Sequence, residues 1–147
     1  MGKRRLAREL TLQFLYQTDA LKGFNPDNNL KQNLDLFWSV KSNVDDEEIK
    51  NFMEILSRGV IENIGGIDDI ISKYSTHWRL SRMPSIDRNI LRMAIYEIVY
   101  LSDIPAPVTI NEAVEIAKKF GSDESSSFIN GILDRVRNVS ERGELGL

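Results

Sequence analysis

The hydrophobic residues of this chain recur mainly at intervals of three and four, the spacing that places side chains on one face of an α-helix. The strongest run covers residues 86–101, where apolar side chains occupy more than one face. A helix that is apolar over most of its circumference is surrounded by other helices. Pro84 and Ser85 predict its start, with the Ser85 hydroxyl as the cap, and the prolines of 105–107 prevent its continuation. We therefore expect residues 86–101 to form the central helix of the fold.

The same periodicity predicts further helices before and after the central one. They cover residues 4–22, 30–38, 49–64, 67–74, 109–120 and 123–136. Gly65-Gly66 marks the end of the third helix, and Thr109 and Glu112 have the spacing of a capping box at the start of the sixth. Ser122-Asp123 provides a cap for the last helix. Because no segment shows strand alternation, the predicted fold class is all-α, a helical bundle in which residues 1–147 form a single domain.

The central helix also carries a narrow polar strip and two carboxylates that lie off it. The strip consists of Arg88, Asn89, Arg92, Tyr96 and Tyr100, which we expect to meet solvent or a partner. Asp87 lies among apolar neighbours, and Glu97 needs a buried partner such as an arginine or a backbone N–H. The two carboxylates are separated by about 15 Å at 1.5 Å per residue, too far for joint acid–base catalysis.

The composition excludes several classes of function. With 147 residues, of which 41% are hydrophobic, the chain can build one core but not two. It has no apolar run of about 18 residues for a membrane span and no signal-peptide core, so we expect a cytoplasmic protein. There are no cysteines and one histidine, His77, which argues against a zinc site or a Ser/His catalytic pair. We expect no catalytic residues, no metal and no cofactor.

Charge is distributed unevenly along the chain. Residues 1–22 carry five basic side chains against two carboxylates, whereas the whole protein has a net charge of −3. Arg5, Arg8 and Gln13 are predicted to lie on the face of the first helix opposite the core. A basic arm on an acidic body suits a polyanion such as nucleic acid, but it is also compatible with a merely solvated helical turn.

Several blocks of residues together resemble the NusB family of bacterial transcription antitermination factors. They are Arg8-Glu9 with Gln13 and Leu15-Tyr16, Trp78 with Arg82, residues 87–92, Tyr96-Glu97, residues 110–113, Phe120-Gly121 and residues 128–134. These blocks follow one another in order over nearly the whole chain, and only residues 23–44 contribute nothing to the resemblance.

The resemblance implies an all-helical fold of two small helical subdomains packed as one domain, and a non-enzymatic role. Members of the family bind boxA RNA in nascent ribosomal RNA leaders together with NusE, a protein of the small ribosomal subunit. The complex lets RNA polymerase ignore termination signals. Both monomers and homodimers occur in the family.

The resemblance also implies roles for particular residues. The RNA-binding arm corresponds to Lys3, Arg4, Arg5 and Arg8, and a second RNA surface to Phe120, Glu124 and Phe128. Contacts with NusE correspond to Tyr16 and, at the start of the central helix, Asp87 and Arg88. Leu6 stands where relatives often have another basic residue, which implies a weaker arm.

Each of these aromatic and acidic residues also has a purely structural interpretation. Phe120 and Phe128 suit stacking on unpaired bases but occupy apolar helical positions typical of a core. Glu124 can accept from base amino groups or act as a charge at a helix N-terminus. His77 and Trp78, next to Arg79, could stack on nucleic acid, although a tryptophan that closes a helix against the core is the favoured interpretation.

Two other functions remain open at this point. NusB-like domains also form the N-terminal part of some ribosomal RNA cytosine methyltransferases, so the chain could be such an RNA-guiding domain without its catalytic part. It lacks the glycine-rich methyl-donor loop and the cysteine nucleophile of those enzymes. The third possibility is a helical interaction module that binds no RNA, against which the basic arm argues only moderately.

Overall fold

The computed structural model describes residues 2–21, 24, 29–76 and 78–145. Within these residues the chain forms seven α-helices and one short 3-10 helix, with no strand, so the predicted all-α class is confirmed. The elements are α1 (Lys3–Ala20), α2 (Leu30–Val40), α3 (Glu47–Glu62), α4 (Ile64–Tyr74), η1 (Leu80–Arg82), α5 (Ser85–Tyr100), α6 (Ala106–Phe120) and α7 (Ser125–Glu141).

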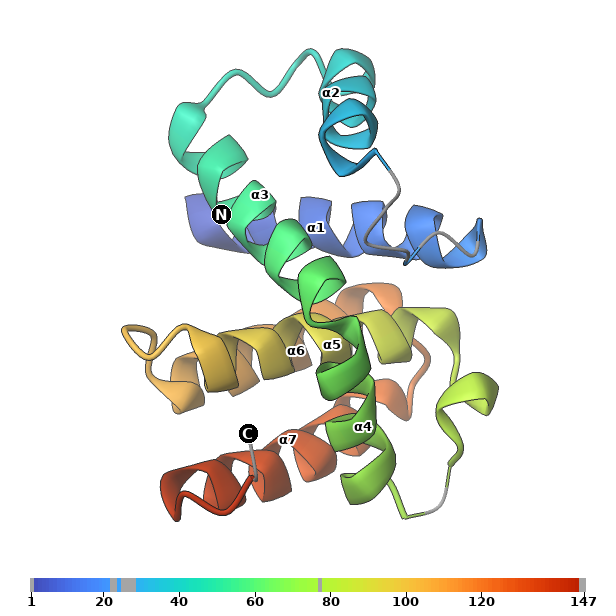
Figure 1. The fold of residues 1–147 in the computed structure, drawn as a ribbon, viewed down its shortest axis with the longest axis vertical. Coiled ribbons are helices and arrows are strands. Elements are labelled where there is room, and N and C mark those ends of the chain that lie inside the picture. The colour runs from blue at the N-terminus through green and yellow to red at the C-terminus, as the bar shows by residue number, and fades with distance from the viewer. Residues whose placement is uncertain (1, 22–23, 25–28, 77, 146–147) are drawn as a thin grey trace.

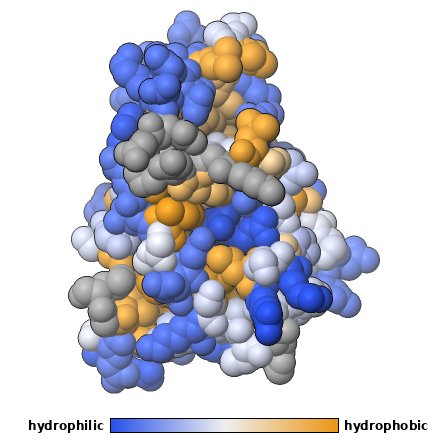
Figure 2. All heavy atoms as spheres, turned by 45° about the vertical axis from the view of Figure 1, so that its right-hand side comes forward, coloured by the Kyte–Doolittle hydropathy of each residue, from blue (hydrophilic) through white to orange (hydrophobic). Residues whose placement is uncertain are grey.

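The helices form two groups that meet at α5. Figure 1 shows α1, α2 and α3 in the upper part of the molecule and α4 to α7 in the lower part. Helix α5 packs against α1, α3, α4, α6 and α7, while α1 lies along α3 and α6 along α7. Ile90, Leu91 and Ile95 of α5 are completely buried. The prediction that this helix is the centre of the fold is therefore confirmed. Most of the surface in the view of Figure 2 is hydrophilic, with a few apolar patches between the polar side chains.

Helices α3 and α4 join at Asn63 and not at the glycines. Asn63 directly follows α3 and directly precedes α4, so it is the C-cap of one helix and the N-cap of the other. Its side-chain amide donates to the carbonyl oxygen of Gly59 at 2.8 Å. Gly65 and Gly66 lie inside the first turn of α4. The prediction that they end the third helix was wrong, because the Asn63 side chain already satisfies a carbonyl at that point.

The starts of α5 and α6 also differ from the predicted caps. Ser85 donates its hydroxyl to the Asp19 carboxylate at 3.3 Å and does not cap α5. Helix α6 begins at Ala106, so Thr109 and Glu112 lie within it and form no capping box. Proline is tolerated in a first helical turn, where its missing N–H would be unpaired in any case, and so the segment we expected to be a break opens the helix.

Much of the polar strip on α5 is buried. The side chains of Arg88, Asn89 and Arg92 all donate to Asp19 of α1, at 2.8 to 3.1 Å. Arg92 also forms a two-bond ion pair with Asp68 of α4. Burial raises the pKa of Asp19, but the hydrogen bonds and positive charges of these donors outweigh it and lower the pKa overall. The strip that we expected to meet solvent or a partner therefore joins α5 to α1 and α4 over these three residues, while Tyr100 at its other end is exposed.

Helices α3 and α5 pack tightly against each other at Gly59. The ring of Tyr96 lies against this glycine, and a Cβ atom at residue 59 would overlap the ring. Tyr96 in turn stacks on Tyr100, with ring centroids 5.3 Å apart. Glycine at residue 59 is therefore a packing requirement.

Candidate nucleic-acid interface

The first basic residue of the predicted arm is paired with the start of α3. The ammonium nitrogen of Lys3 is 3.1 Å from carboxylate oxygens of both Asp46 and Glu48. Hydrogen bonds to these two carboxylates raise the pKa of Lys3. Asp46 also caps α3 by accepting from the backbone N–H of Glu48 at 3.0 Å. Lys3 therefore lies at the surface, but its charge is already matched.

Arg5 is held by a carboxylate of α6. Its Nε donates to Oε1 of Glu112 at 2.9 Å, and a second bond joins Nη2 to Oε2. The hydrogen bond from Arg5 lowers the pKa of Glu112 despite partial burial, and the same bond raises the pKa of Arg5. Both side chains remain partly accessible, so this pair lies at the edge of the fold.

Arg8 is an interior residue. It is only 3% exposed and donates from Nε and Nη2 to the two oxygens of Glu97, both at 2.8 Å. The Thr109 hydroxyl donates to the same carboxylate at 3.0 Å. The prediction that Glu97 needs a buried partner, an arginine or a backbone N–H, is confirmed, and the partner is an arginine. The prediction that Arg8 lies on the exposed face of its helix was wrong. A buried carboxylate requires such a partner, and this requirement places Arg8 inside.

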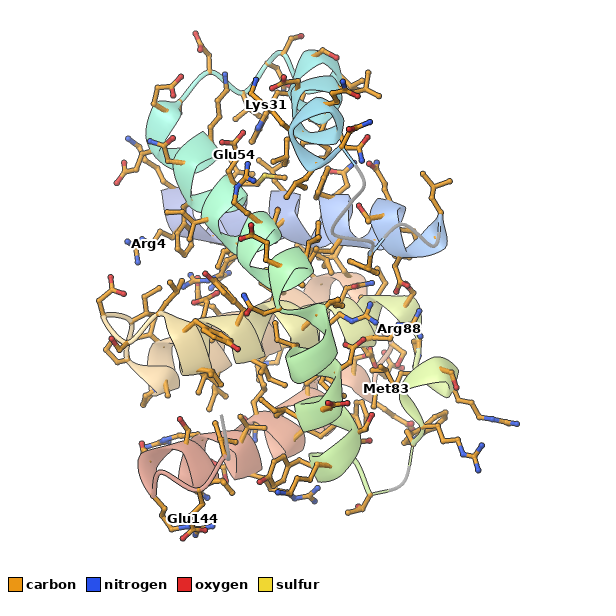
Figure 3. The ribbon with its side chains drawn as sticks, in the orientation of Figure 1. Arg4, Lys31, Glu54, Met83, Arg88 and Glu144 are labelled. Carbon is orange, nitrogen blue, oxygen red and sulfur yellow. The ribbon has the colours of Figure 1, made fainter. Side chains whose placement is uncertain are left out.

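Arg4 is the most accessible arginine of the arm. It is exposed, and its guanidinium carbon lies 4.5 Å from the centroid of the Phe52 ring. In Figure 3 its side chain points away from α1 at the edge of the molecule. Arg4 makes no ion pair with any residue in the described part of the chain. A guanidinium that rests on an aromatic face can still donate hydrogen bonds in its own plane.

The second predicted RNA surface begins at the end of α6. Phe120 is 43% exposed, so the interpretation of this ring as a core residue was wrong. The ammonium of Lys119 lies 5.2 Å from its centroid and 3.0 Å from a Glu9 carboxylate oxygen of α1. Glu124 is exposed immediately before α7 and its side chain caps no backbone N–H. Phe128 is half-buried and packs against the core with part of its ring.

Ion pairs join these two surfaces. Arg5 with Glu112 and Glu9 with Lys119 both connect α1 to α6. The accessible edge of the arm and the Phe120 ring therefore belong to one continuous side of the molecule.

An apolar groove lies next to Phe120. It has a volume of about 250 Å³ and its polar lining is limited to Glu9 and Gln13. The walls include Tyr16 of α1, which is 43% exposed, together with Ile86 of α5 and Phe120. The predicted partner residue Tyr16 is thus accessible and stands beside a hollow that fits an apolar side chain.

Asp87 does not face this groove. It is 4% exposed and accepts a hydrogen bond from the Ser125 hydroxyl at 2.7 Å, which ties the start of α5 to the start of α7. Burial raises the pKa of Asp87, and the bond from Ser125 offsets this only partly. Direct contact with a partner requires an exposed carboxylate, which Asp87 lacks in this conformation; its role in partner binding stays a prediction.

Arg88 is also largely occupied within the fold. It pairs with Asp19 at 2.8 Å and donates to the carbonyl oxygens of Leu80 and Met83, at 3.0 and 3.2 Å. Figure 3 shows Arg88 on the first turns of α5, close to Met83 of the preceding loop. Arg88 therefore fixes the segment that leads into α5.

Trp78 is not packed as the sequence suggested. It is 49% exposed, so the interpretation of this residue as one that closes a helix against the core was wrong. Its neighbour His77 lies outside the described residues. Trp78 lines a groove together with Phe128 and Arg135, and no periodicity in the sequence indicated that Arg135 belongs to a site.

The described residues contain neither a metal-binding cluster nor a membrane-spanning helix. No group of three or more His, Asp or Glu side chains there could hold a metal ion. None of the helices in that part of the chain is long and apolar enough to cross a membrane.

Comparison with known proteins identifies the family. The profile of the NusB family matches residues 5–138. The chain belongs to the NusB family. The transcription antitermination protein NusB of Thermodesulfovibrio yellowstonii is 50% identical over 137 residues, which cover 91% of each chain. That of Desulforapulum autotrophicum is 48% identical, over 98% of this chain and 99% of the relative.

Solved NusB structures share the architecture. The structure of T. maritima NusB matches with a TM-score of 0.78 and 38% identity, over 94% of this chain and 92% of that one. A structure described as antitermination factors NusB and NusE in complex with dsRNA has the same fold, with a TM-score of 0.77 at 24% identity over 95% and 98% of the two chains. The NusB fold is thus established here, and both relatives are named transcription antitermination proteins.

Proposed function

We propose that this chain binds single-stranded boxA RNA of nascent ribosomal RNA leaders together with NusE. In the cytoplasm the complex would associate with RNA polymerase and carry it past termination signals. The chain contributes binding surfaces and no catalysis. Membership of the NusB family supports this proposal at the level of transcription antitermination.

The observation that carries the RNA-binding proposal is the accessible edge formed by α1 and α6. It has an exposed arginine, Arg4, and a partly accessible one, Arg5, at one end, and an exposed ring, Phe120, at the other. Guanidinium groups neutralise phosphates, and aromatic rings accept unpaired bases on their faces. This combination suits single-stranded RNA better than it suits a duplex.

Base preference comes from the start of α7 in this proposal. The exposed Glu124 carboxylate repels phosphate, so it adds nothing to general affinity. A carboxylate can accept a hydrogen bond from the amino group of cytosine. Glu124 therefore selects a base next to Phe128, while the arginines hold the backbone.

NusE occupies the apolar groove of Tyr16, Ile86 and Phe120 in this proposal. The groove borders the RNA-binding edge because Phe120 belongs to both. The described complex of NusB, NusE and dsRNA has the same fold, which supports NusE as the partner. Arg88 and Asp87 hold the start of α5, from which Ile86 projects.

The test is fluorescence anisotropy with a boxA RNA and a scrambled RNA, each with and without NusE. Affinity for boxA should exceed that for the scrambled sequence, and NusE should increase it. Arg4→Gln should weaken boxA binding several-fold and reduce the slope of log affinity against log salt by about 0.7, the value for one phosphate contact on a single strand. Lys31→Gln is the control, since Lys31 is an exposed cation of α2. Equal affinities for the two RNAs in the presence of NusE would contradict the proposal.

A further inference from the structure

The loop between α4 and η1 displays an aromatic side chain that the fold does not use. The Trp78 carbonyl oxygen accepts a hydrogen bond from the buried Ser75 hydroxyl at 3.0 Å, which closes the turn after α4. The backbone of Trp78 is thus anchored, while its indole remains half exposed. Tryptophan is enriched at binding interfaces, because it combines a large apolar surface with a polar N–H.

Trp78 stands between two adjoining hollows. One, of about 180 Å³, extends toward α7 and is lined by Phe128, Ile132 and Arg135. The other, of about 410 Å³, extends toward η1 and is lined by Arg79 and Leu80. Ser75, Thr76 and Trp78 line both. The two hollows thus share the Trp78 segment as part of their lining, and we name the pair of hollows the Trp78 groove.

The charge of the Trp78 groove is positive. Its cationic lining residues are Arg79 and Arg135, and among the described residues no carboxylate lines either hollow. Arg79 makes no ion pair within the described part of the chain, and Arg135 donates only to the carbonyl oxygen of Tyr74, at 2.9 Å. Arg82, which follows one turn of η1 later, is exposed and likewise unpaired among these residues.

This lining fits a flat apolar group attached to an anion. Two aromatic rings provide stacking surfaces, two guanidinium groups provide donors for phosphate, and Ser75, Thr76 and Ser127 provide hydroxyls. An unpaired nucleotide has these features, and aromatic stacking with electrostatic attraction is the usual mode of single-strand binding. An acidic peptide would match the charge but would leave the paired aromatic walls without a function.

The Trp78 groove is also continuous with the RNA surface proposed above. Phe128 lies one helical turn after Glu124 and also lines the groove. RNA that passes Glu124 and Phe128 along α7 therefore reaches Trp78 next.

We propose that the Trp78 groove is an additional single-stranded RNA-binding site, in which an unpaired base stacks on the indole and Arg79 and Arg135 contact the adjacent phosphates. This inference rests on the proposed function. It extends the RNA path from the edge of α1 and α6 across the start of α7 to the loop before η1.

Tryptophan fluorescence provides the direct test, in the full-length chain with Trp38→Phe. Trp38 is the other tryptophan; it lies on α2 and donates to Glu54 of α3 at 3.2 Å, so its removal leaves Trp78 as the single reporter. A single-stranded boxA oligonucleotide should quench the Trp78 emission, with the same half-saturation as measured by anisotropy. Quenching that is absent at saturating RNA would overturn the inference.

Substitutions distinguish stacking from charge. Trp78→Ala should weaken RNA binding about 10-fold, the usual order for loss of one stacked base, without a change in the salt slope. Trp78→Phe should restore most of the affinity. Arg79→Gln should instead reduce the slope by about 0.7. Leu36→Ala, which removes an exposed apolar side chain of α2, is the matched control and should bind RNA like the wild type.

The outcomes separate this inference from the proposed function. If Arg4→Gln weakens RNA binding but Trp78→Ala does not, the Trp78 groove is not an RNA site and the proposed function stands. If the wild type binds no RNA even with NusE, both are wrong. If Trp78→Ala weakens NusE binding while RNA affinity is unchanged, the groove is a protein-binding site and the inference is overturned. Circular dichroism melting of each variant shows that the loss is not one of folding.

Discussion

Two stretches of this chain look alike in sequence and differ completely in the structure. Residues 3–8 contain Lys3, Arg4, Arg5 and Arg8 around a leucine, and residues 78–82 contain Arg79 and Arg82 around another. Three of the four cations in the first stretch are paired, with carboxylates of α3, α5 and α6. The two in the second meet no carboxylate within the described residues.

The difference shows that a basic stretch is not the same as an available charge. Arg8 meets its carboxylate partner 89 positions further along the chain, and Arg5 meets Glu112 after 107 positions. Their charges serve mainly to hold α1 against α5 and α6. The loop at residues 78–82 has the smaller number of cations but leaves them open to a ligand.

Breaking the buried pair of the first stretch should give the largest effect. Glu97→Ala removes both short hydrogen bonds of the buried Arg8 guanidinium and leaves it only the longer contact with Glu112, at 3.4 Å. Loss of the main partner of a buried charge typically costs about 3–5 kcal/mol of folding stability. Urea unfolding followed by circular dichroism measures this loss. In the double variant Arg8→Met/Glu97→Leu most of the stability should return, since both charges are then absent. A loss below about 1 kcal/mol for Glu97→Ala would show that Arg8 finds water or another partner.

Removing the ion pair between Arg5 and Glu112 should have a smaller effect, and it should strengthen RNA binding. Glu112 competes with phosphate for Arg5, so Glu112→Gln should raise affinity for single-stranded RNA about 3-fold and steepen the salt slope. Glu141→Gln is the matched control, because it removes the same charge at the end of α7. If both variants gain equally, the effect is one of net charge and Glu112 does not restrain Arg5.

The pH dependence of stability should show the smallest effect. The native pKa of Glu112 is below its ordinary value of 4.5, mainly through the hydrogen bond from Arg5. The unfolded chain therefore binds this proton first, and the stabilising contribution is lost as the pH falls from about 4.5 through the native pKa. Chemical unfolding at pH 6 and pH 3.5 should show a larger loss for the wild type than for Glu112→Gln. Equal losses in both would mean that the pair adds no pH-dependent stability.

The helices were predictable because each is amphipathic over its own length. The seven α-helices and the central position of α5 follow from local spacing, and so does the need of Glu97 for a buried partner. The predictions of helix caps failed where the capping side chain has a hydrogen-bond partner that is distant in the sequence. Thr109 had the position of a cap, but its hydroxyl binds Glu97.

The site was less predictable for the same reason. The sequence shows which residues are charged or aromatic, but not which of them the fold uses. Arg8 is buried because it pairs with the buried carboxylate of Glu97. The Ser75 hydroxyl binds the backbone carbonyl of Trp78 and not its side chain, so the indole stays exposed. Neither partner can be inferred from spacing along one helix.

Because Tyr96 lies against Gly59, the ionisation of its phenol depends on the packing of α3 on α5. Burial, with the nearby negative charge of Glu62, raises the pKa of Tyr96, so its phenol ionises at a higher pH than an exposed tyrosine. The ring keeps this property only while α3 lies on α5. The chain has four tyrosines, so the difference between the alkaline absorbance titrations of the wild type and Tyr96→Phe isolates this phenol. Its pKa returns toward the ordinary value when α3 leaves α5, and the upper and lower groups of helices then no longer dock at this point.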